Sequence, residues 1–429
     1  MEKPPSLNNS PFSYQHQISS YLEALDETFL STYLSTPEAS SKFSQLNSIY
    51  SILSSDSKTI TIKDFQTLRS YAISPGGFLT SKFRRIFYKK IFCINKTNFT
   101  NMVYIDLQSN IPIINDIQGI KRVETKHKAF NKLEISPDID IIKMDSLRSK
   151  VSSIIKPKEN RNNIINQIKN DLQYFLSEIT SFNGNTYSYF QGYHDIALYF
   201  LMLYYNKPTI NIGIAVFQRF SEFCLKELLY TSKLNNNTRY EIINSLFLLK
   251  EVIHILNQNI YELIINKCTN GLPTFAASWV LSLFTHCLES THLLYRLFDY
   301  FIVSHPINVY YLVAQIIIEE IEKGRKRKVS FNEVDISFFK FFQELNLDKL
   351  DYEYYILKTE ENIKRFPISL LKDTFHKIGI KNNYPLAMEE SYVLKWVMKN
   401  NKDEIKYSFG WYLEGQFNLL KSLFNINKD

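Results

Sequence analysis

The chain has 429 residues, of which 45% are hydrophobic and 22% are charged. This composition is ordinary for a folded protein, and the length exceeds what one compact core usually serves, so one large or two smaller lobes are expected. The net charge of +7, from 50 Lys and Arg against 43 Asp and Glu, is too small and too scattered to require a nucleic-acid partner.

Glycine is scarce, with 11 residues in the whole chain, which favours long helices over a sheet with frequent tight turns. The four cysteines lie far apart and form no CxxC pair, so neither a zinc site nor a disulfide framework is indicated. The first residues carry no apolar secretory signal. The longest apolar stretches, 197–205 and 309–318, fall short of the roughly 20 residues that a membrane-spanning helix needs. An all-α protein of the reducing cytosol is expected.

In chain order, residues 1–20 are expected to be a loose polar tail and residues 21–50 one or two short helices. From Thr61 apolar residues recur at helical spacing until the sequence SPGG at 74–77 predicts a turn. A basic helix then begins near Thr80. The charged segment 101–158 has mixed periodicity and is expected to be an insertion or linker.

The second half is helical almost throughout. One long amphipathic helix is predicted over 242–263, and Pro273 opens another. The later expectations, in chain order, are a helix ended by His305-Pro306, a buried helix over 307–320, a solvated basic run at 323–328, and a helix from a capping box of Ser330 and Glu333 to Leu345.

The octad YFQGYHDI, residues 189–196, places a glutamine and a glycine between aromatic residues, directly before the apolar run 197–205. A polar amide at this point must face something outside the core. The octad resembles the glutamine-finger motif of the TBC-domain family, whose members accelerate GTP hydrolysis by Rab GTPases. Its extension GYHDI is similar to the branch of that family found at the endoplasmic reticulum.

Other segments resemble the same family in the same order. ISPGGFLTSKFRRIFYKKIF, residues 73–92, is similar to its opening helix, although Phe87 stands where the family has tryptophan. IKNDLQY is similar to the first catalytic motif, Ile-x-x-Asp-x-x-Arg, with Ile168 and Asp171 in register and Tyr174 in place of the arginine. LPTFAASWVLSLFTHCLES and LYRLFDYFIVSHP resemble the carboxy-terminal helices, so the match spans 73–371.

The resemblance implies an all-α fold with a V-shaped arrangement of two helical lobes. It divides the chain into a tail with short helices at 1–58, a Rab-GAP-like domain at 59–371 that contains the insertion 101–158, and C-terminal helices at 372–429. It also implies a Rab-family GTPase as partner. The chain would activate that partner's GTP hydrolysis without turnover of its own, and it would need no metal or cofactor, because GTP and Mg²⁺ belong to the partner.

The resemblance assigns roles to individual residues. The catalytic positions are Gln191 as the glutamine finger, Tyr174 at the arginine-finger position, and Asp171. Gln191 and Tyr189 are expected at one mouth of a groove, with Asp171 and Tyr174 close by. The partner-binding positions are Tyr189, Gly192, Tyr193, His194 and Asp195. The Gln191 amide can both donate and accept, as orienting a water requires, and Gly192 lets a partner's backbone come close.

Tyr174 is the departure from the family pattern. A neutral phenol cannot replace a guanidinium at a developing negative charge. Loss of an arginine finger costs about 10³ to 10⁵ in rate. Arg161, 13 positions upstream, is a candidate for a displaced finger.

From the residues alone, Gln191 can equally cap the following helix, and Asp171 can be a solvated carboxylate near a helix start.

Several alternatives stay open. The chain can be a pseudo-activator that binds a Rab without accelerating hydrolysis, and an RNA-binding helical protein has only the basic charge and the many aromatic residues in its favour. His286 and His292 are six apart and do not form a metal motif. The basic run 323–328 and the amphipathic segment 411–429 allow at most a peripheral membrane contact, at the endoplasmic reticulum or Golgi.

Overall fold

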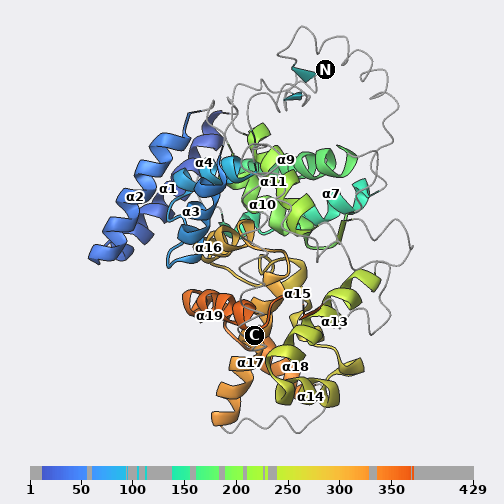
Figure 1. Cartoon of the computed structure of the whole chain (residues 1–429). Helices are drawn as coiled ribbons and strands as arrows, with labels where there is room; N and C mark the ends of the chain where they lie inside the picture. Colours follow the sequence, from blue (N-terminus) through green and yellow to red (C-terminus); the bar gives the residue numbers. More distant parts are fainter. Residues whose placement is uncertain are drawn as a thin grey trace, which may run out of the picture.

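The computed structural model describes residues 12–55, 60–92, 94, 104–105, 112–113, 138–154, 161–182, 189–205, 210–225, 228–229, 239–327, 336–368 and 370–371. These residues form helices in two lobes, one around α9–α11 and one around α13 and α17, with α16 between them (Figure 1). The only strands among them are a two-residue pair, β1 (Tyr104–Ile105) and β2 (Pro112–Ile113), paired antiparallel. The prediction of an all-α fold with two helical lobes is confirmed.

The first lobe contains nine of the described helices. They are α1 (Phe12–Tyr33), α2 (Pro37–Leu53), α3 (Ile62–Ile73), α4 (Ser81–Ile91), α7 (Ile139–Arg148), α8 (Val151–Ile154), α9 (Arg161–Phe182), α10 (Tyr193–Leu203) and, closing this lobe with them, α11 (Ile210–Cys224). At its centre α10 is buried over its whole length, because it is apolar nearly all round, and it packs against α9 and α11.

The second lobe follows in chain order. Its elements are α13 (Arg239–Leu256), α14 (Gln258–Lys267), the 3₁₀ turns η2 (Thr269–Gly271) and η3 (Thr274–Ala276), α15 (Ala277–Leu281), α17 (Asn308–Lys326), α18 (Ile336–Gln343), η4 (Leu347–Lys349) and α19 (Tyr352–Arg365). The helix between the lobes, α16, covers Thr291–Ile302. The predicted buried helix is α17, which packs between α13 and α19. The core is one continuous cluster that runs through both lobes.

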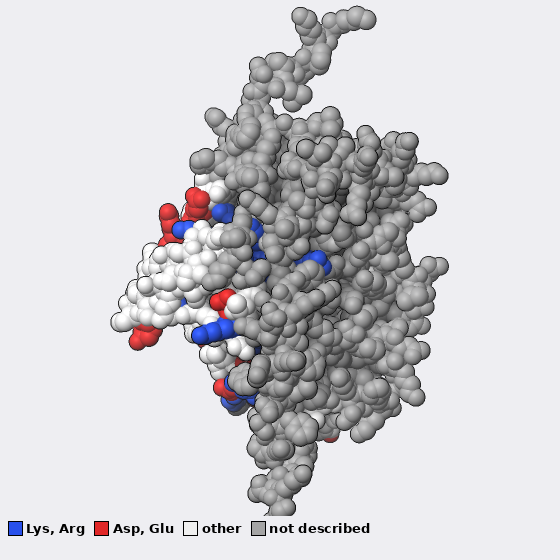
Figure 2. All heavy atoms as spheres, turned by 45° about the horizontal axis from the view of Figure 1, so that its top comes forward, with Lys and Arg blue, Asp and Glu red and all other residues white. Residues whose placement is uncertain are grey.

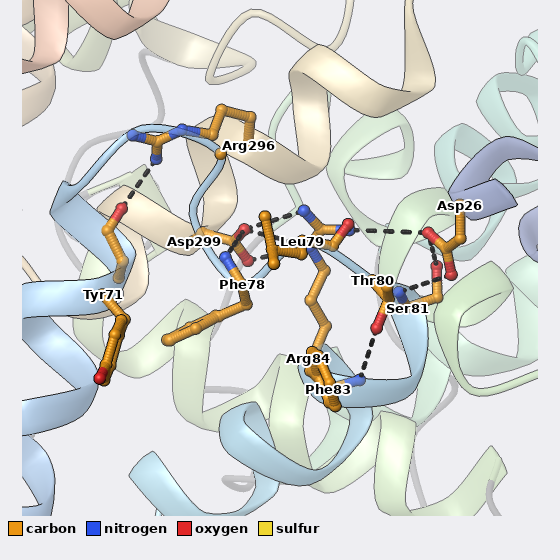
Figure 3. Close-up of polar contacts among 12 residues, drawn as sticks. Asp26, Tyr71, Phe78, Leu79, Thr80, Ser81, Phe83, Arg84, Arg296 and Asp299 are labelled. Carbon is orange, nitrogen blue, oxygen red and sulfur yellow. Dashed lines mark hydrogen bonds and ion pairs between the residues drawn. The ribbon is translucent and has the colours of Figure 1, made fainter. Parts of the chain in front are cut away.

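The predicted turn at 74–77 wraps around a buried carboxylate from α16 (Figure 3). Asp299 accepts hydrogen bonds from the Phe78 backbone amide at 2.9 Å, from the Arg84 guanidinium at 2.9 to 3.1 Å, and from the Tyr88 hydroxyl at 2.6 Å. Gly77 has a φ of +57°, and a Cβ there would lie 2.4 Å from the Asp299 carboxylate. The turn therefore requires glycine, and it ties α4 to α16.

Arg296 lies three residues before Asp299 on α16, and it contacts the other side of the 74–77 turn. Its guanidinium donates to the Ala72 and Ile73 carbonyl oxygens at 2.8 and 3.1 Å and pairs with Glu353 of α19 at 2.7 Å. Both arginines have side chains only 1% exposed. Two ion pairs thus hold the N-terminal helices, α16 and α19 together, one fully buried and one with the Glu353 side chain 36% exposed.

The N-terminal prediction needs correction. Residues 12–33 form one helix of 22 residues rather than part of a loose tail. Ile18 and Leu22 are fully buried in the core, and Asp26 accepts a hydrogen bond from the Ser81 backbone amide at 2.8 Å. Tertiary packing therefore orders a segment whose polar composition had indicated a tail.

The long helix predicted over 242–263 is two helices. Asn257 has extended backbone angles, and its side chain accepts a hydrogen bond from the Ile260 amide, which caps the start of α14. The apolar spacing continues across the break, so periodicity alone did not reveal it.

The insertion predicted at 101–158 contains α7, which the sequence pattern missed. On this helix the apolar Ile141, Met144 and Leu147 are exposed, whereas Asp145 and Ser146 are buried. The usual relation between polarity and burial is inverted on these positions, so no helical core face could be recognised.

Other expectations lie outside the described residues. They are the capping box of Ser330 and Glu333, the cysteine at position 93, and everything from 372 to 429, including the amphipathic segment 411–429. Within the described helices, none is both long and apolar enough to cross a membrane. At the left of Figure 2, where Figure 1 places α1 and α2, acidic and basic side chains are interspersed among uncharged ones.

Candidate functional site

Gln191 lies at the tip of a tight turn that leads into α10. The Tyr193 amide donates to the Phe190 carbonyl at 3.1 Å, and Gly192 has a φ of +100°, a conformation that favours glycine. Gln191 itself is exposed, whereas Tyr189 and Phe190 before it are buried. The sequence thus anchors an aromatic pair in the core and presents the amide to solvent.

Tyr189 fixes the base of this turn to α7. Its backbone amide donates to Asp138 at 2.8 Å, and its hydroxyl donates to Asp145 at 2.8 Å. The hydroxyl also lies 2.8 Å from His194 Nδ1. Burial, then the hydrogen bond to Asp145, raises the pKa of Tyr189, so the phenol keeps its proton.

A second set of polar contacts joins the start of α10 to the connection between α15 and α16. The buried Asp195 accepts from His286 Nδ1 at 3.0 Å and lies 3.3 Å from His194 Nε2. The hydrogen bond to Asp195 raises the pKa of His286, whereas burial lowers the pKa of His194. A Cβ on Gly192 would lie 3.6 Å from the Ser282 Cβ, so the turn sits against this connection.

These contacts change the roles expected for the octad. Tyr193 is fully buried, and Tyr189, His194 and Asp195 are at most 8% exposed. They face α7, α11 and the α15–α16 connection rather than solvent. Direct partner binding by these four residues does not agree with their burial, and they position the turn that carries Gln191.

Asp171 does not lie beside Gln191. Its carboxylate is buried on α9 and accepts from the Gln167 amide and from the Tyr205 hydroxyl. Tyr205 follows the C-terminal end of α10, whereas Gln191 precedes the N-terminal end, and a helix of 11 residues spans about 16 Å. Both the expected proximity and the solvated alternative are wrong for Asp171, which instead ties α9 to α10.

Tyr174 lies one turn further along α9 and is half-buried. The next residue, Phe175, stacks on Phe217, which also stacks on Tyr193 at the start of α10. Arg161 is the first residue of α9, and 13 positions of helix place it about 20 Å from Tyr174. The C-terminal end of α9 is the end nearer to the Gln191 turn. Arg161, at the N-terminal end, is therefore far from that turn.

The family model of the Rab-GTPase-TBC domain matches residues 107–324 of this chain. This range includes α7, the turn at Gln191 and both histidines of the site. The chain belongs to the Rab-GTPase-TBC domain family.

Three curated relatives show the extent of the likeness. The chain is 33% identical to GTPase-activating protein gyp10 of Schizosaccharomyces pombe over 132 residues, which cover 30% of this chain and 32% of that protein. It is 24% identical to TBC1 domain family member 20 of Homo sapiens and of Bos taurus over 309 residues, which cover 72% of this chain and 65% of each relative. The chain therefore spans less than two thirds of the length of each of these relatives.

The TBC-domain site contains residues that sequence reasoning missed. Asp138 and Asp145 come from the segment expected to be a linker, and the sequence indicated no role at the site for His286, whose spacing from His292 argued against a metal motif. Their contacts join positions 44 to 91 residues apart, so no local pattern could indicate them. Among the described residues, no group of three or more His, Cys, Asp or Glu is arranged to hold a metal ion.

Replacing Tyr189 by phenylalanine should loosen the turn. The change leaves the buried Asp145 carboxylate without its closest donor, and we expect a loss of about 1–3 kcal/mol in the free energy of unfolding. Tyr311→Phe removes a comparable hydroxyl bond, 2.7 Å to the Phe366 carbonyl, far from the site. Urea unfolding of both variants measures stability, and only Tyr189→Phe should also weaken activity toward a GTPase. Equal activity in the two variants would show that Tyr189 does not position the turn.

Proposed function

We propose that this TBC-domain protein is a GTPase activator that acts on a Rab-family GTPase of the endoplasmic reticulum and Golgi pathway. The observation that carries the proposal is the exposed amide of Gln191 on a turn whose neighbours are held by buried hydrogen bonds. Family membership and the two kinds of relative support it. The chain would act from the cytoplasm, with peripheral membrane contact at most.

The chemistry follows from what a slow GTPase lacks. Negative charge spreads over the transferring phosphoryl group, and the attacking water is poorly held. Gln191 can orient that water, because its side-chain carbonyl oxygen accepts from the water while its amide NH₂ group donates to the phosphoryl oxygens. Because the turn is already fixed, little further conformational entropy is lost when Gln191 makes this contact. GTP and Mg²⁺ come with the partner.

A GTPase activator also supplies a cation that neutralises the developing charge. Tyr174 stands where the resemblance places the arginine, and it brings no charge. On α7 the same Ile-x-x-Asp-x-x-Arg spacing recurs in Ile142, Asp145 and the exposed Arg148, which makes Arg148 the alternative source of that cation. Without a cation from Arg148, activation is expected to be weak. The second candidate function, favoured by this one substitution, is a pseudo-activator that binds the GTPase without accelerating hydrolysis.

Gln191→Ala tests the proposal. In single-turnover assays with a Rab that responds to the chain, the variant should lower the stimulated rate by at least about tenfold, because the water is no longer oriented. Gln343→Ala, an exposed glutamine at the end of α18, is the matched control and should leave the rate unchanged. Retained stimulation in Gln191→Ala would rule out the assigned role.

A further inference from the structure

The connection between α15 and α16, residues 282–290, holds a backbone conformation that residues other than glycine avoid. Leu283 and Phe284 have φ values of +48° and +68°, in the left-handed region that crowds a Cβ. Both side chains are at most 3% exposed, and the Phe284 ring packs against Trp279 and Tyr352. Such a conformation persists only where the packing around it determines it, and such conformations cluster at functional sites.

The second lobe fixes the other end of the same connection. The backbone amides of Glu289 and Ser290 donate to the Asp348 carboxylate of η4 at 3.1 and 2.8 Å. Within the connection, the backbone amide of His286 donates to the Ser282 hydroxyl at 3.1 Å. The connection is therefore a defined support rather than a loose loop.

Lys150, between α7 and α8, is bound to this support. Its ammonium group donates to the carbonyl oxygens of Thr285 at 3.1 Å, His286 at 2.6 Å and Leu288 at 3.3 Å. An ammonium group has three N–H donors, so one side chain can bind all three carbonyl oxygens. Lys150 follows Arg148 by two residues. Its contacts thus fix the end of the helix that carries the alternative source of the cation.

His286 extends from the same connection to the start of α10. Its Nδ1 lies 3.0 Å from the carboxylate of Asp195, which is 3% exposed and lies in the first turn of that helix. Asp195 follows Gln191 by four residues. One strained segment therefore contacts both the end of α7 and the turn that carries the glutamine.

We propose that the α15–α16 connection aligns the two catalytic groups with each other, and that Lys150 and His286 are the positioning residues through which it does so. Lys150 acts through Arg148, and His286 acts through Asp195 on the Gln191 turn. This inference rests on the proposed function. A displacement of about 1 Å can cost about 10² in rate, so loss of either contact should lower the rate of hydrolysis more than the affinity for the partner.

Lys150→Met tests the first contact, because it keeps the aliphatic stem and removes the donors. At a saturating concentration of the chain, the single-turnover rate on a responding Rab should fall about tenfold, with less than about a twofold change in affinity. Lys150→Arg keeps a cationic donor and should recover most of the rate. The matched control is Lys42→Met, since Lys42 also donates to three carbonyl oxygens, those of Tyr71, Ser74 and Pro75. It should leave the rate unchanged below its unfolding temperature.

The outcomes separate this inference from the proposed function. An unchanged rate in Lys150→Met, a loss in affinity alone, or an equal loss in Lys150→Arg overturns the inference, provided that the unmodified chain stimulates the same Rab. In each of these cases the proposed function stands. Failure of the unmodified chain to stimulate any Rab overturns both.

The contact of His286 adds a pH dependence. The hydrogen bond to Asp195 raises the pKa of His286, against burial and the charge of Lys150. The protonated ring makes a charge-assisted bond to Asp195 at low pH, and this bond weakens as the pH rises through the raised pKa. Asp195 also faces His194, whose pKa is lowered by burial, and His194 lies 3.7 Å from Asp145.

A pH profile tests this second contact without the Lys150 variants. The stimulated rate, divided by the Rab's own rate at each pH, should fall about threefold from pH 6 to pH 8 in the unmodified chain. His286→Asn keeps a neutral donor near the Nδ1 position and should give a flat profile at the high-pH level. If Lys150→Met does not fold, this profile decides alone. A flat profile in the unmodified chain, or the same fall in His286→Asn, overturns the inference.

Discussion

Tyr174→Arg should raise the rate of stimulated GTP hydrolysis at least tenfold. An arginine finger is worth about 10³ to 10⁵ in rate, or ~4 to ~7 kcal/mol of transition-state stabilisation. The turn already presents Gln191, and Tyr174 lies half-buried on α9, one residue before the stack of Phe175, Phe217 and Tyr193 that leads to α10. A guanidinium added here would supply the charge that Tyr174 lacks.

The control adds the same charge at the neighbouring position. Gln173→Arg places a guanidinium about 100° further round α9, and it should give little gain. Single-turnover hydrolysis and Rab affinity are measured for both variants. An unchanged rate in Tyr174→Arg with binding retained would show that Tyr174 is not the finger position. Strong activity in the unmodified chain would show that another arginine supplies the charge.

Asp299→Ala should destabilise the protein by about 3–5 kcal/mol, since it leaves the buried Arg84 without its principal counterion. Among the residues that the structure describes, Arg84 has one other carboxylate within 4.0 Å, that of Asp26. The same change removes the acceptor of the Phe78 amide and of the Tyr88 hydroxyl. The free energy of unfolding in urea measures the effect.

An exposed ion pair provides the comparison. Glu361 pairs with Lys358 at 2.9 Å with both side chains open to solvent, and Glu361→Ala should cost no more than about 1 kcal/mol. A similarly small cost for Asp299→Ala would mean that the network around the 74–77 turn does not hold α4 to α16. Both variants keep Gln191 and its turn unchanged.

The sequence predicted the fold best where proline and glycine residues and the helical spacing of apolar residues indicate the same boundaries. The SPGG turn, the helix that begins at Thr80 and the helix that ends before Pro306 all occur as expected. Proline and glycine act through the local backbone, so their effect is readable without tertiary structure. The burial of α17 follows in the same way from its nearly continuous apolar surface.

The site was only partly predictable. The octad identified Gln191 and the turn, but the residues that hold the turn are Asp138, Asp145 and His286, contributed by α7 and the α15–α16 connection. Asp171 was placed near Gln191 because two motifs were expected to act together. The hydrogen bond from Tyr205 shows that its carboxylate belongs to the packing of α9 on α10.

Binding of the unmodified chain to a panel of Rabs, with GDP alone and with GDP plus aluminium fluoride, tests the central claim most directly. Aluminium fluoride mimics the transferring phosphoryl group, and an activator binds its partner more tightly in a state that resembles the transition state. We predict that at least one Rab binds more tightly with aluminium fluoride than with GDP alone, and that Gln191→Ala removes the difference. Equal binding in both states for every Rab that binds, or no binding at all, would contradict activation by this site.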